Sequence, residues 1–305
     1  MRVKKRNGVG VLIMRYEGDI YSPHIAGDDY ILQCTIGCSH NRCTFCSMYK
    51  DKIFRIRDMA DILYDIEMAK EYYGDIEKIF LGDGDALTMP ATSLIEILDR
   101  LYATFPGLFY VGSYASPGSI LNKTSLEMKQ LQEHGLVEIH LGVESGDQNV
   151  LHDIRKGVTY DEMVAAGQKV RDAGIQLFIT VILGLAGRTS GALIHAEHTA
   201  RICNDIQPDY IGILTVMVQP RTELHKKLQE GKFQLPEDKE TLEEMSAIIK
   251  HLELNNCGIT SIHPSNCLHL DGMLPPDKEK LLHILARAID GTDPVPPRPL
   301  DLPKV

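Results

Sequence analysis

Cys34-Thr-Ile-Gly-Cys38-Ser-His-Asn-Arg-Cys43-Thr-Phe-Cys46 is the most informative stretch of the sequence. It holds four of the seven cysteines, and the last three are spaced C-x4-C-x2-C. In a chain without secretory features, cysteines this close together indicate thiolate ligands of a metal rather than disulfides. A closed zinc site commonly uses two C-x2-C pairs, and this sequence has a single one. The pattern favours an iron–sulfur site and leaves zinc as the alternative.

The length and composition predict a globular protein with a substantial core. The chain has 305 residues, 44% of them hydrophobic and 24% charged, which is ordinary for a soluble domain. Its net charge of −10 disfavours nucleic acid as a principal partner, because a phosphate-binding surface is basic. The basic start, residues 1–6, precedes only a short apolar patch, and no run is long enough to span a membrane. We expect a cytoplasmic protein.

Apolar runs alternate with amphipathic helical stretches from residue 30 onward. This alternation predicts repeated βα units and a parallel sheet. Helices are predicted near residues 59–73, 94–101, 124–135, 159–174, 193–203, 242–252 and 277–289. The predicted strands are Tyr30–Leu32, Ile79–Leu81, Phe109–Val111, Ile139–Val143, Leu177–Leu183, Tyr210–Val218 and, as a seventh, Gly258–Ile262.

Unusual polar and glycine-rich motifs follow the predicted strands. Gly82-Asp-Gly-Asp85 follows the second strand, Gly142-Val-Glu-Ser-Gly146 ends the fourth, and Gly184-Leu-Ala-Gly187 follows the fifth. In a parallel barrel, reactive groups lie on the loops at the carboxyl ends of the strands. We therefore expect these motifs and the cysteine stretch to meet at one end of a barrel.

The cysteine loop resembles that of the radical S-adenosylmethionine (SAM) superfamily. Gly37-Cys38, Cys43 and Phe45-Cys46 match its glycine, cysteines and aromatic residue, with one residue more than the usual C-x3-C-x2-C signature. Cys34 and Cys38 would give the usual first spacing, but the next interval is then too long, so Cys34 stays an alternative to Cys38. The resemblance implies that Cys38, Cys43 and Cys46 bind a [4Fe–4S] cluster, with Phe45 beside the cofactor and one iron left for SAM.

Two further motifs resemble SAM-contacting elements of the superfamily. Asp83-Gly84-Asp85 is similar to the Gly-Gly-Glu-like motif that holds the amino group of SAM. Glu144-Ser145 is similar to a ribose-contacting pair in a branch resembling anaerobic coproporphyrinogen oxidases and methylthiotransferases.

Three single residues complete the implied SAM site. Arg155 could pair with the SAM carboxylate through its planar fork, or be a solvated helix charge. Gly184 belongs to an element similar to a Gly-Leu-Pro-Gly motif that approaches adenine, and Gln219 follows the sixth strand and could complete the adenine pocket.

Two residues are candidates for work on a substrate. Tyr114 follows the third strand and could contact the substrate or relay a radical, with a plain wall residue as the alternative. His263 follows the seventh strand and could donate a proton, with a capped turn as the alternative.

The resemblance implies an α/β fold, a partial (β/α)6 TIM-like barrel with parallel strands and a C-terminal strand/helix extension. We expect an N-terminal leader (1–28), a radical SAM core (29–220), an extension covering the barrel edge (221–292) and a proline-rich tail (293–305). The implied activity is reductive cleavage of SAM to a 5′-deoxyadenosyl radical, which abstracts hydrogen from a small or medium-sized substrate. The electron donor would be a flavodoxin or ferredoxin. The alternatives are an RNA- or peptide-modifying radical SAM enzyme and a noncatalytic iron–sulfur or zinc protein.

Overall fold

The computed structural model describes residues 14–21, 23, 30–189 and 191–298. Its main element is an eight-stranded sheet in the order β1-β4-β5-β6-β7-β8-β9-β10. Each neighbouring pair from β1 to β9 is parallel, and β10 pairs antiparallel with β9. The strands are β1 (Tyr30–Gln33), β4 (Lys78–Gly82), β5 (Tyr110–Ala115), β6 (Glu138–Glu144), β7 (Gln176–Leu183), β8 (Tyr210–Thr215), β9 (Cys257–Thr260) and β10 (Asp271–Leu274).

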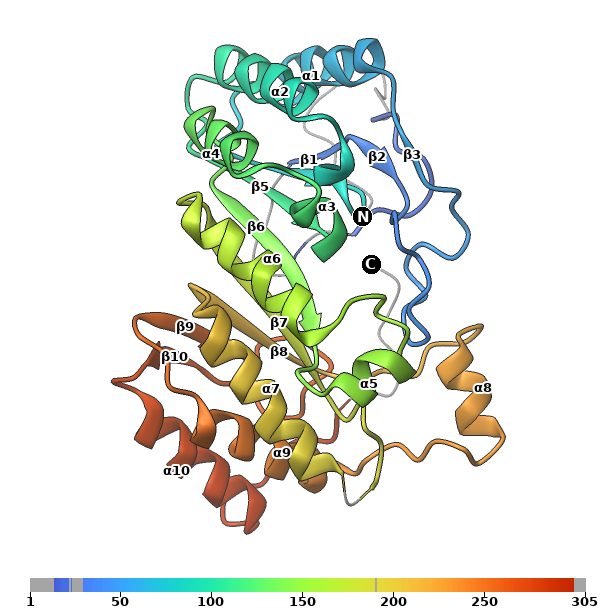
Figure 1. The fold of residues 1–305 in the computed structure, drawn as a ribbon, viewed down its shortest axis with the longest axis vertical. Helices are drawn as coiled ribbons and strands as arrows, with labels where there is room; N and C mark the ends of the chain where they lie inside the picture. The colour runs from blue at the N-terminus through green and yellow to red at the C-terminus, as the bar shows by residue number, and fades with distance from the viewer. Residues whose placement is uncertain (1–13, 22, 24–29, 190, 299–305) are drawn as a thin grey trace.

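Helices cover one side of this sheet. Figure 1 shows the strands following one another from β1 to β10, with α1, α2, α4, α6, α7 and α10 along the outer side. Every second side chain of a strand points toward the helices. These side chains pack with the helices in one apolar cluster, so the large core lies between the helices and the sheet. The helices are α1 (Met59–Tyr73), α2 (Ala91–Thr104), α3 (Pro117–Leu121), α4 (Ser125–Glu133), α5 (Gln148–Asp153), α6 (Tyr160–Asp172), α7 (Ala192–Ile206), α8 (Glu223–Gln229), α9 (Asp238–His251) and α10 (Lys278–Ile289), with a 3₁₀ turn η1 at Ala86–Thr88.

The predicted fold class is confirmed. Six parallel strands alternate with helices in an open sheet, and β9 continues it as the predicted seventh strand. Local signals also hold: Thr124 and Thr159 cap α4 and α6, and each makes a capping box with the glutamate three residues later. These reciprocal bonds satisfy amides that the first helical turn leaves without partners.

The structure differs from the sequence prediction at several short elements. Phe109 lies outside β5 and is exposed, and β8 ends at Thr215 rather than Val218. The two-stranded sheet of β2 (Thr35–Ile36) and β3 (Arg55–Ile56) was not predicted, nor were β10, α3, α5 and α8. Each of these is too short to show a clear hydrophobic period, which needs a longer window to stand out.

The two ends of the chain are described only in part. In the predicted leader, Tyr16 Oη donates to the Ile31 carbonyl at 2.8 Å, and the Glu17 amide donates to Gln33 Oε1 at 2.9 Å. Residues 1–13, 22 and 24–28 of the leader and the tail beyond residue 298 lie outside the described residues. The proposed division into four segments stays a prediction. In the described part of the chain, no helix has the length and apolar character needed to cross a membrane.

Candidate functional site

The cysteine loop follows β2 at the carboxyl end of β1. Its start is fixed to the loop after β4, because the Gly37 amide donates to Asp83 Oδ2 at 2.9 Å and the Gly84 amide donates to the Gly37 carbonyl at 3.1 Å. Its end is fixed from the other side, where the Thr44 amide donates to the Ile154 carbonyl at 2.9 Å. The loop therefore lies where three chain segments meet.

The three predicted ligands lie together on this loop. Cys38, Cys43 and Cys46 are all half-buried. Burial raises the pKa of Cys43, and it raises the pKa of Cys46 to about 11, to which charges on Cys43 and Cys38 also contribute. The thiols are therefore near enough to act on one another electrostatically.

The donor set of this loop fits an iron–sulfur cluster. Its three half-buried thiols belong to one short loop, and cysteine thiolates are the ligands that hold the irons of such a cluster. Thr44 lies between Cys43 and Cys46 in the sequence, and its Oγ1 is buried without a hydrogen-bond partner. This hydroxyl could donate to a cluster sulfur, since hydrogen bonds to sulfur are part of how proteins set cluster potentials.

Cys34, the alternative ligand, lies elsewhere. Its side chain is fully buried in the main core, and burial raises its pKa to about 12. The charges that act on it belong to Arg57 and Asp65. The surroundings of Cys34 are those of a structural thiol.

Asp83, the first carboxylate of the motif after β4, is surrounded by donors of the chain itself. Its Oδ2 accepts from Lys52 Nζ at 2.9 Å, from Gln33 Nε2 at 3.0 Å and from the Gly37 amide at 2.9 Å. The side chains of Lys52 and Asp83 are only 5% and 1% exposed. This buried ion pair holds the start of the cysteine loop against the sheet.

Asp85 has internal partners as well. It is fully buried, accepts from the Ser119 hydroxyl at 2.6 Å and from the Ser116 amide at 3.1 Å, and also accepts from the Ser39 hydroxyl. Between the two carboxylates, a Cβ on Gly84 would lie 2.9 Å from Cys38 Cβ. The motif thus brings bare backbone against a predicted ligand. Its contact with the SAM amino group stays a prediction, and the carboxylates already tie the loop to the fold.

Glu144 is at the centre of the predicted ribose site. It ends β6 with a left-handed φ of 66°. Its Oε1 accepts from Lys156 Nζ at 2.9 Å and its Oε2 from Thr180 Oγ1 at 3.3 Å. Burial lowers the pKa of Lys156, but Glu144 and the nearby Cys43 outweigh that effect and raise it overall. A largely buried cation therefore lies against the Glu144 carboxylate and near the cysteine loop.

Lys156, the residue after the predicted SAM contact Arg155, is the cation that pairs with Glu144. Arg155 has a φ of 54° and pairs with Glu223 at 2.5 Å on the surface, where both side chains are at least half exposed. Because the backbone turns there, the two neighbouring cations point to different surroundings. The adjacency of two basic residues was the available signal, but only the turn shows which one faces the thiols.

Four other predicted residues have local contacts within the fold. Ser145 is buried, and its hydroxyl accepts from the Asp147 amide at 2.9 Å in a local turn. The Gly184 amide donates to Glu244 Oε2 at 3.0 Å. Phe45 packs on a second apolar cluster that lies under the loop, and the carbonyl of Gln219 accepts from the Thr222 hydroxyl at 2.7 Å. Their predicted contacts with adenine, ribose and cofactor stay predictions.

Of the two substrate candidates, Tyr114 lies closer to the loop. Burial raises the pKa of Tyr114. Burial also raises the pKa of Tyr49, and Tyr114, Cys46 and Cys38 add to that effect, so Tyr49 lies near both Tyr114 and the thiols. His263 Nδ1 is 2.7 Å from Ser265 Oγ and accepts from the Ser265 amide at 3.1 Å. This is the local capped turn that was the alternative for His263.

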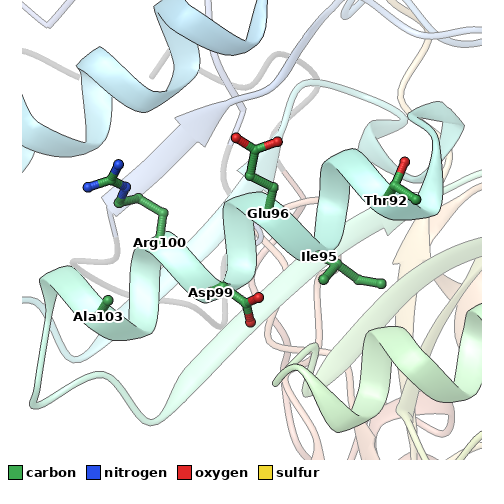
Figure 2. A pocket seen from close by; sticks show the side chains of 6 residues that line it. All are labelled: Thr92, Ile95, Glu96, Asp99, Arg100 and Ala103. Carbon is green, nitrogen blue, oxygen red and sulfur yellow. The ribbon is translucent and has the colours of Figure 1, made fainter.

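A surface hollow of about 460 Å³ lies away from these residues. All its lining residues belong to α2, and Figure 2 shows them along the outer side of that helix. The hollow shares no residue with the strand-end motifs.

The sequence of this chain is similar to those of known proteins. Residues 32–197, more than half of the chain, match the family described as Radical SAM superfamily. The heme chaperone HemW of Bacillus subtilis is 20% identical over 200 residues, which are 65% of this chain and 52% of HemW. The anaerobic magnesium-protoporphyrin IX monomethyl ester cyclase of Rubrivivax gelatinosus is 26% identical over 220 residues, covering 71% of this chain and 38% of the cyclase. The chain thus spans about half or less of the length of these curated relatives.

Solved structures agree in fold. Coproporphyrinogen III oxidase (HemN) from Escherichia coli, described as a radical SAM enzyme, has a TM-score of 0.55 at 16% identity, covering 73% of this chain and 51% of HemN. The methyltransferase TsrM from Kitasatospora setae, solved with cobalamin and a [4Fe–4S] cluster, has a TM-score of 0.55 at 16% identity, covering 67% of this chain and 39% of TsrM. The family match decides the assignment, and the predicted resemblance is confirmed. The chain belongs to the radical SAM superfamily.

Proposed function

We propose that this chain is a radical SAM enzyme that binds a [4Fe–4S] cluster and SAM and acts on a small or medium-sized substrate. The observation that carries the proposal is the Lys156 ammonium, which lies largely buried against the Glu144 carboxylate and near the cysteine loop. A cation and an anion side by side next to three thiols suit a zwitterionic ligand held beside a cluster. Family membership supports the same assignment.

Each group has a role in this proposal. Cys38, Cys43 and Cys46 would hold the cluster, and Lys156 would pair with the SAM carboxylate. Glu144 would accept hydrogen bonds from the ribose hydroxyls while keeping its contact with Lys156. When bound, the cluster and SAM supply a 5′-deoxyadenosyl radical that abstracts hydrogen from the substrate. The protein orders the ligands, balances their charges and excludes water.

The metal content tests the cofactor directly. After anaerobic reconstitution we expect about four irons per chain with labile sulfide, and stoichiometric zinc would contradict the proposal. Cys38→Ala, Cys43→Ala and Cys46→Ala should each lose the cluster absorbance. Cys34→Ala is the matched control because its thiol lies in the core, and it should keep the iron; loss of iron from this variant alone would assign the ligand role to Cys34.

The reaction is tested by incubating the reconstituted protein anaerobically with SAM and dithionite. Formation of 5′-deoxyadenosine, measured by mass spectrometry, is the expected result. Reduced flavodoxin or ferredoxin should replace dithionite, because the proposal assigns such a protein as electron donor. A protein that holds the cluster but forms no 5′-deoxyadenosine with any reductant would be a noncatalytic iron–sulfur protein, and the proposal would be wrong.

A further inference from the structure

A second polar cluster lies on the inner face of the sheet, the face that points away from the helices. Along β6, Ile139, Leu141 and Val143 join the helix-facing core. Because strand side chains alternate, Glu138 and His140 point to the opposite face. The sequence analysis treated this stretch as a plain apolar strand and assigned neither residue.

His140 is held in one orientation. Its Nε2 lies 2.5 Å from Glu138 Oε1, and the Tyr110 hydroxyl donates to the same oxygen at 2.6 Å. His140 is 6% exposed and Glu138 is 9% exposed. Because a carboxylate oxygen is the acceptor in this hydrogen bond, a proton of the imidazole is assigned to Nε2.

The other nitrogen of His140 is then a hydrogen-bond acceptor. Among the described residues, the hydrogen bond between Nε2 and Glu138 is the one that the His140 side chain makes. Nδ1 is not among the buried side-chain atoms that lack a partner, so it is open to solvent or to a ligand. A carboxylate that fixes the tautomer of a histidine and makes its free nitrogen more basic is typical of functional sites.

Aromatic rings surround the imidazole ring of His140. Phe178 stacks on His140 at 4.6 Å between centroids and 11° between planes, and Phe80 and Tyr114 stand edge-on to it at 5.2 and 5.9 Å. Glycines let the rings lie close to the sheet, since a Cβ on Gly212 would come within 2.9 Å of the Phe178 ring. The His140 imidazole therefore lies among aromatic rings on the inner face of the sheet.

This cluster lies one layer below the proposed cofactor site. His140 is opposite Phe178 in the β6–β7 register, and the next inward-facing pair is Gly142 and Thr180. Thr180 donates to Glu144, the proposed ribose contact. In barrels, such inward-facing side chains form successive layers beneath the functional end.

We propose that His140 Nδ1 accepts a hydrogen bond from the substrate, and that the substrate is a planar aromatic or heteroaromatic compound carrying a ring N–H or O–H group. Phe178 and Tyr114 supply the surfaces that hold its ring, with preferred offset or edge-to-face geometry. Glu138 is a positioning residue, because it acts through His140, and the Tyr110 hydroxyl donates to Glu138. This inference rests on the proposed function, since it names the substrate class of the same site.

The test uses the reconstituted holoenzyme with its cluster oxidised, labelled with ¹⁵N in the histidine rings. Phenol and indole are the probes, and toluene is the shape-matched control that lacks a donor. We expect the free protein to show His140 protonated at Nε2, and phenol and indole to move the Nδ1 signal toward the protonated position. Toluene should leave that signal in place. The signal is assigned by its loss in His140→Gln.

Variants separate recognition from packing. His140→Gln should weaken phenol binding about tenfold, as expected when a buried donor loses its partner, and leave toluene binding unchanged. Phe178→Leu should weaken both compounds. His152→Gln is the control, because the His152 side chain is 86% exposed, and it should match the wild type. A proton on Nδ1, or equal effects of phenol and toluene, would overturn the inference.

The two proposals fail in different ways. If the wild type forms 5′-deoxyadenosine but phenol does not reach Nδ1, only the substrate class is wrong. If phenol shifts Nδ1 but no 5′-deoxyadenosine forms with any reductant, the inner-face acceptor stands and the radical SAM activity is wrong.

Discussion

Replacing Lys156 with methionine should destabilise the protein strongly. Methionine keeps a similar apolar stem but removes the ammonium that lies 2.9 Å from Glu144 Oε1. The two side chains are 11% and 12% exposed, so the carboxylate would be left buried without its cation. Breaking such a pair from one side costs ~3–5 kcal/mol. Urea unfolding of the metal-free protein under anaerobic conditions measures this cost.

A double variant identifies the cause. Lys156→Met with Glu144→Gln should recover most of the loss, because two neutral side chains leave no buried charge. Lys226→Met is the control, since Lys226 is 75% exposed, and it should change the unfolding free energy by no more than ~0.5 kcal/mol. A cost below ~1 kcal/mol for the single variant, or strictly additive costs in the double variant, would refute the reasoning.

The pH dependence of the stabilisation by Lys156 follows from the direction in which its pKa is shifted. The pKa of Lys156 is raised above its value in the unfolded chain, so the pair stabilises the fold fully below about pH 10.4. That stabilisation is lost only as pH rises through the higher, folded-state pKa. The difference in unfolding free energy between wild type and Lys156→Met should therefore be the same at pH 7 and pH 9.

Two further variants test how the cysteine loop is supported. Gly84→Ala should cost ~1–3 kcal/mol by overpacking and lower cluster occupancy, because the new methyl would lie 2.7 Å from the Tyr49 ring and 2.9 Å from Cys38 Cβ. Gly107→Ala is the control, since nothing lies within 4 Å of its Cβ, and it should change neither stability nor occupancy. Equal iron content in the two variants would contradict this account. Asp147→Ala should cost ~1 kcal/mol, because the Asp147 carboxylate caps α5 through the amides of residues 149 and 150, whereas Asp147→Asn should keep most of the cap. The pKa of Asp147 is lowered because its hydrogen bonds outweigh its burial, so this cap should weaken only as pH falls through that lowered value, and urea midpoints between pH 3 and 7 would show it.

The sequence was sufficient for the order of strands and for where the motifs gather. Both depend on hydrophobic period and on the position of glycines and carboxylates relative to each strand end, which are local properties of the chain. His140 escaped notice for the same reason, since one polar residue inside an apolar run does not change the period. Its importance depends on Glu138 two residues before it and on Phe178 of the next strand.

The partners of charged residues could not be predicted in this way. Asp83 pairs with Lys52, and Asp85 with the start of α3, across separations of about thirty residues. Such pairs depend on how strands and loops are placed in space, which no local pattern encodes. The pairing of Lys156 with Glu144 was equally hidden, because the chain turns at Arg155, which has a left-handed φ.

The two buried aspartates after β4 have a consequence for how a cofactor is received. Asp83 fastens Gly37, just before the ligand-bearing segment, and Asp85 fastens Ser39, one residue past the leading cysteine. The backbone on both sides of Cys38 is thus held by contacts of the fold itself. Binding of the proposed cluster at Cys38 would then cost less backbone freedom than binding to a loose loop.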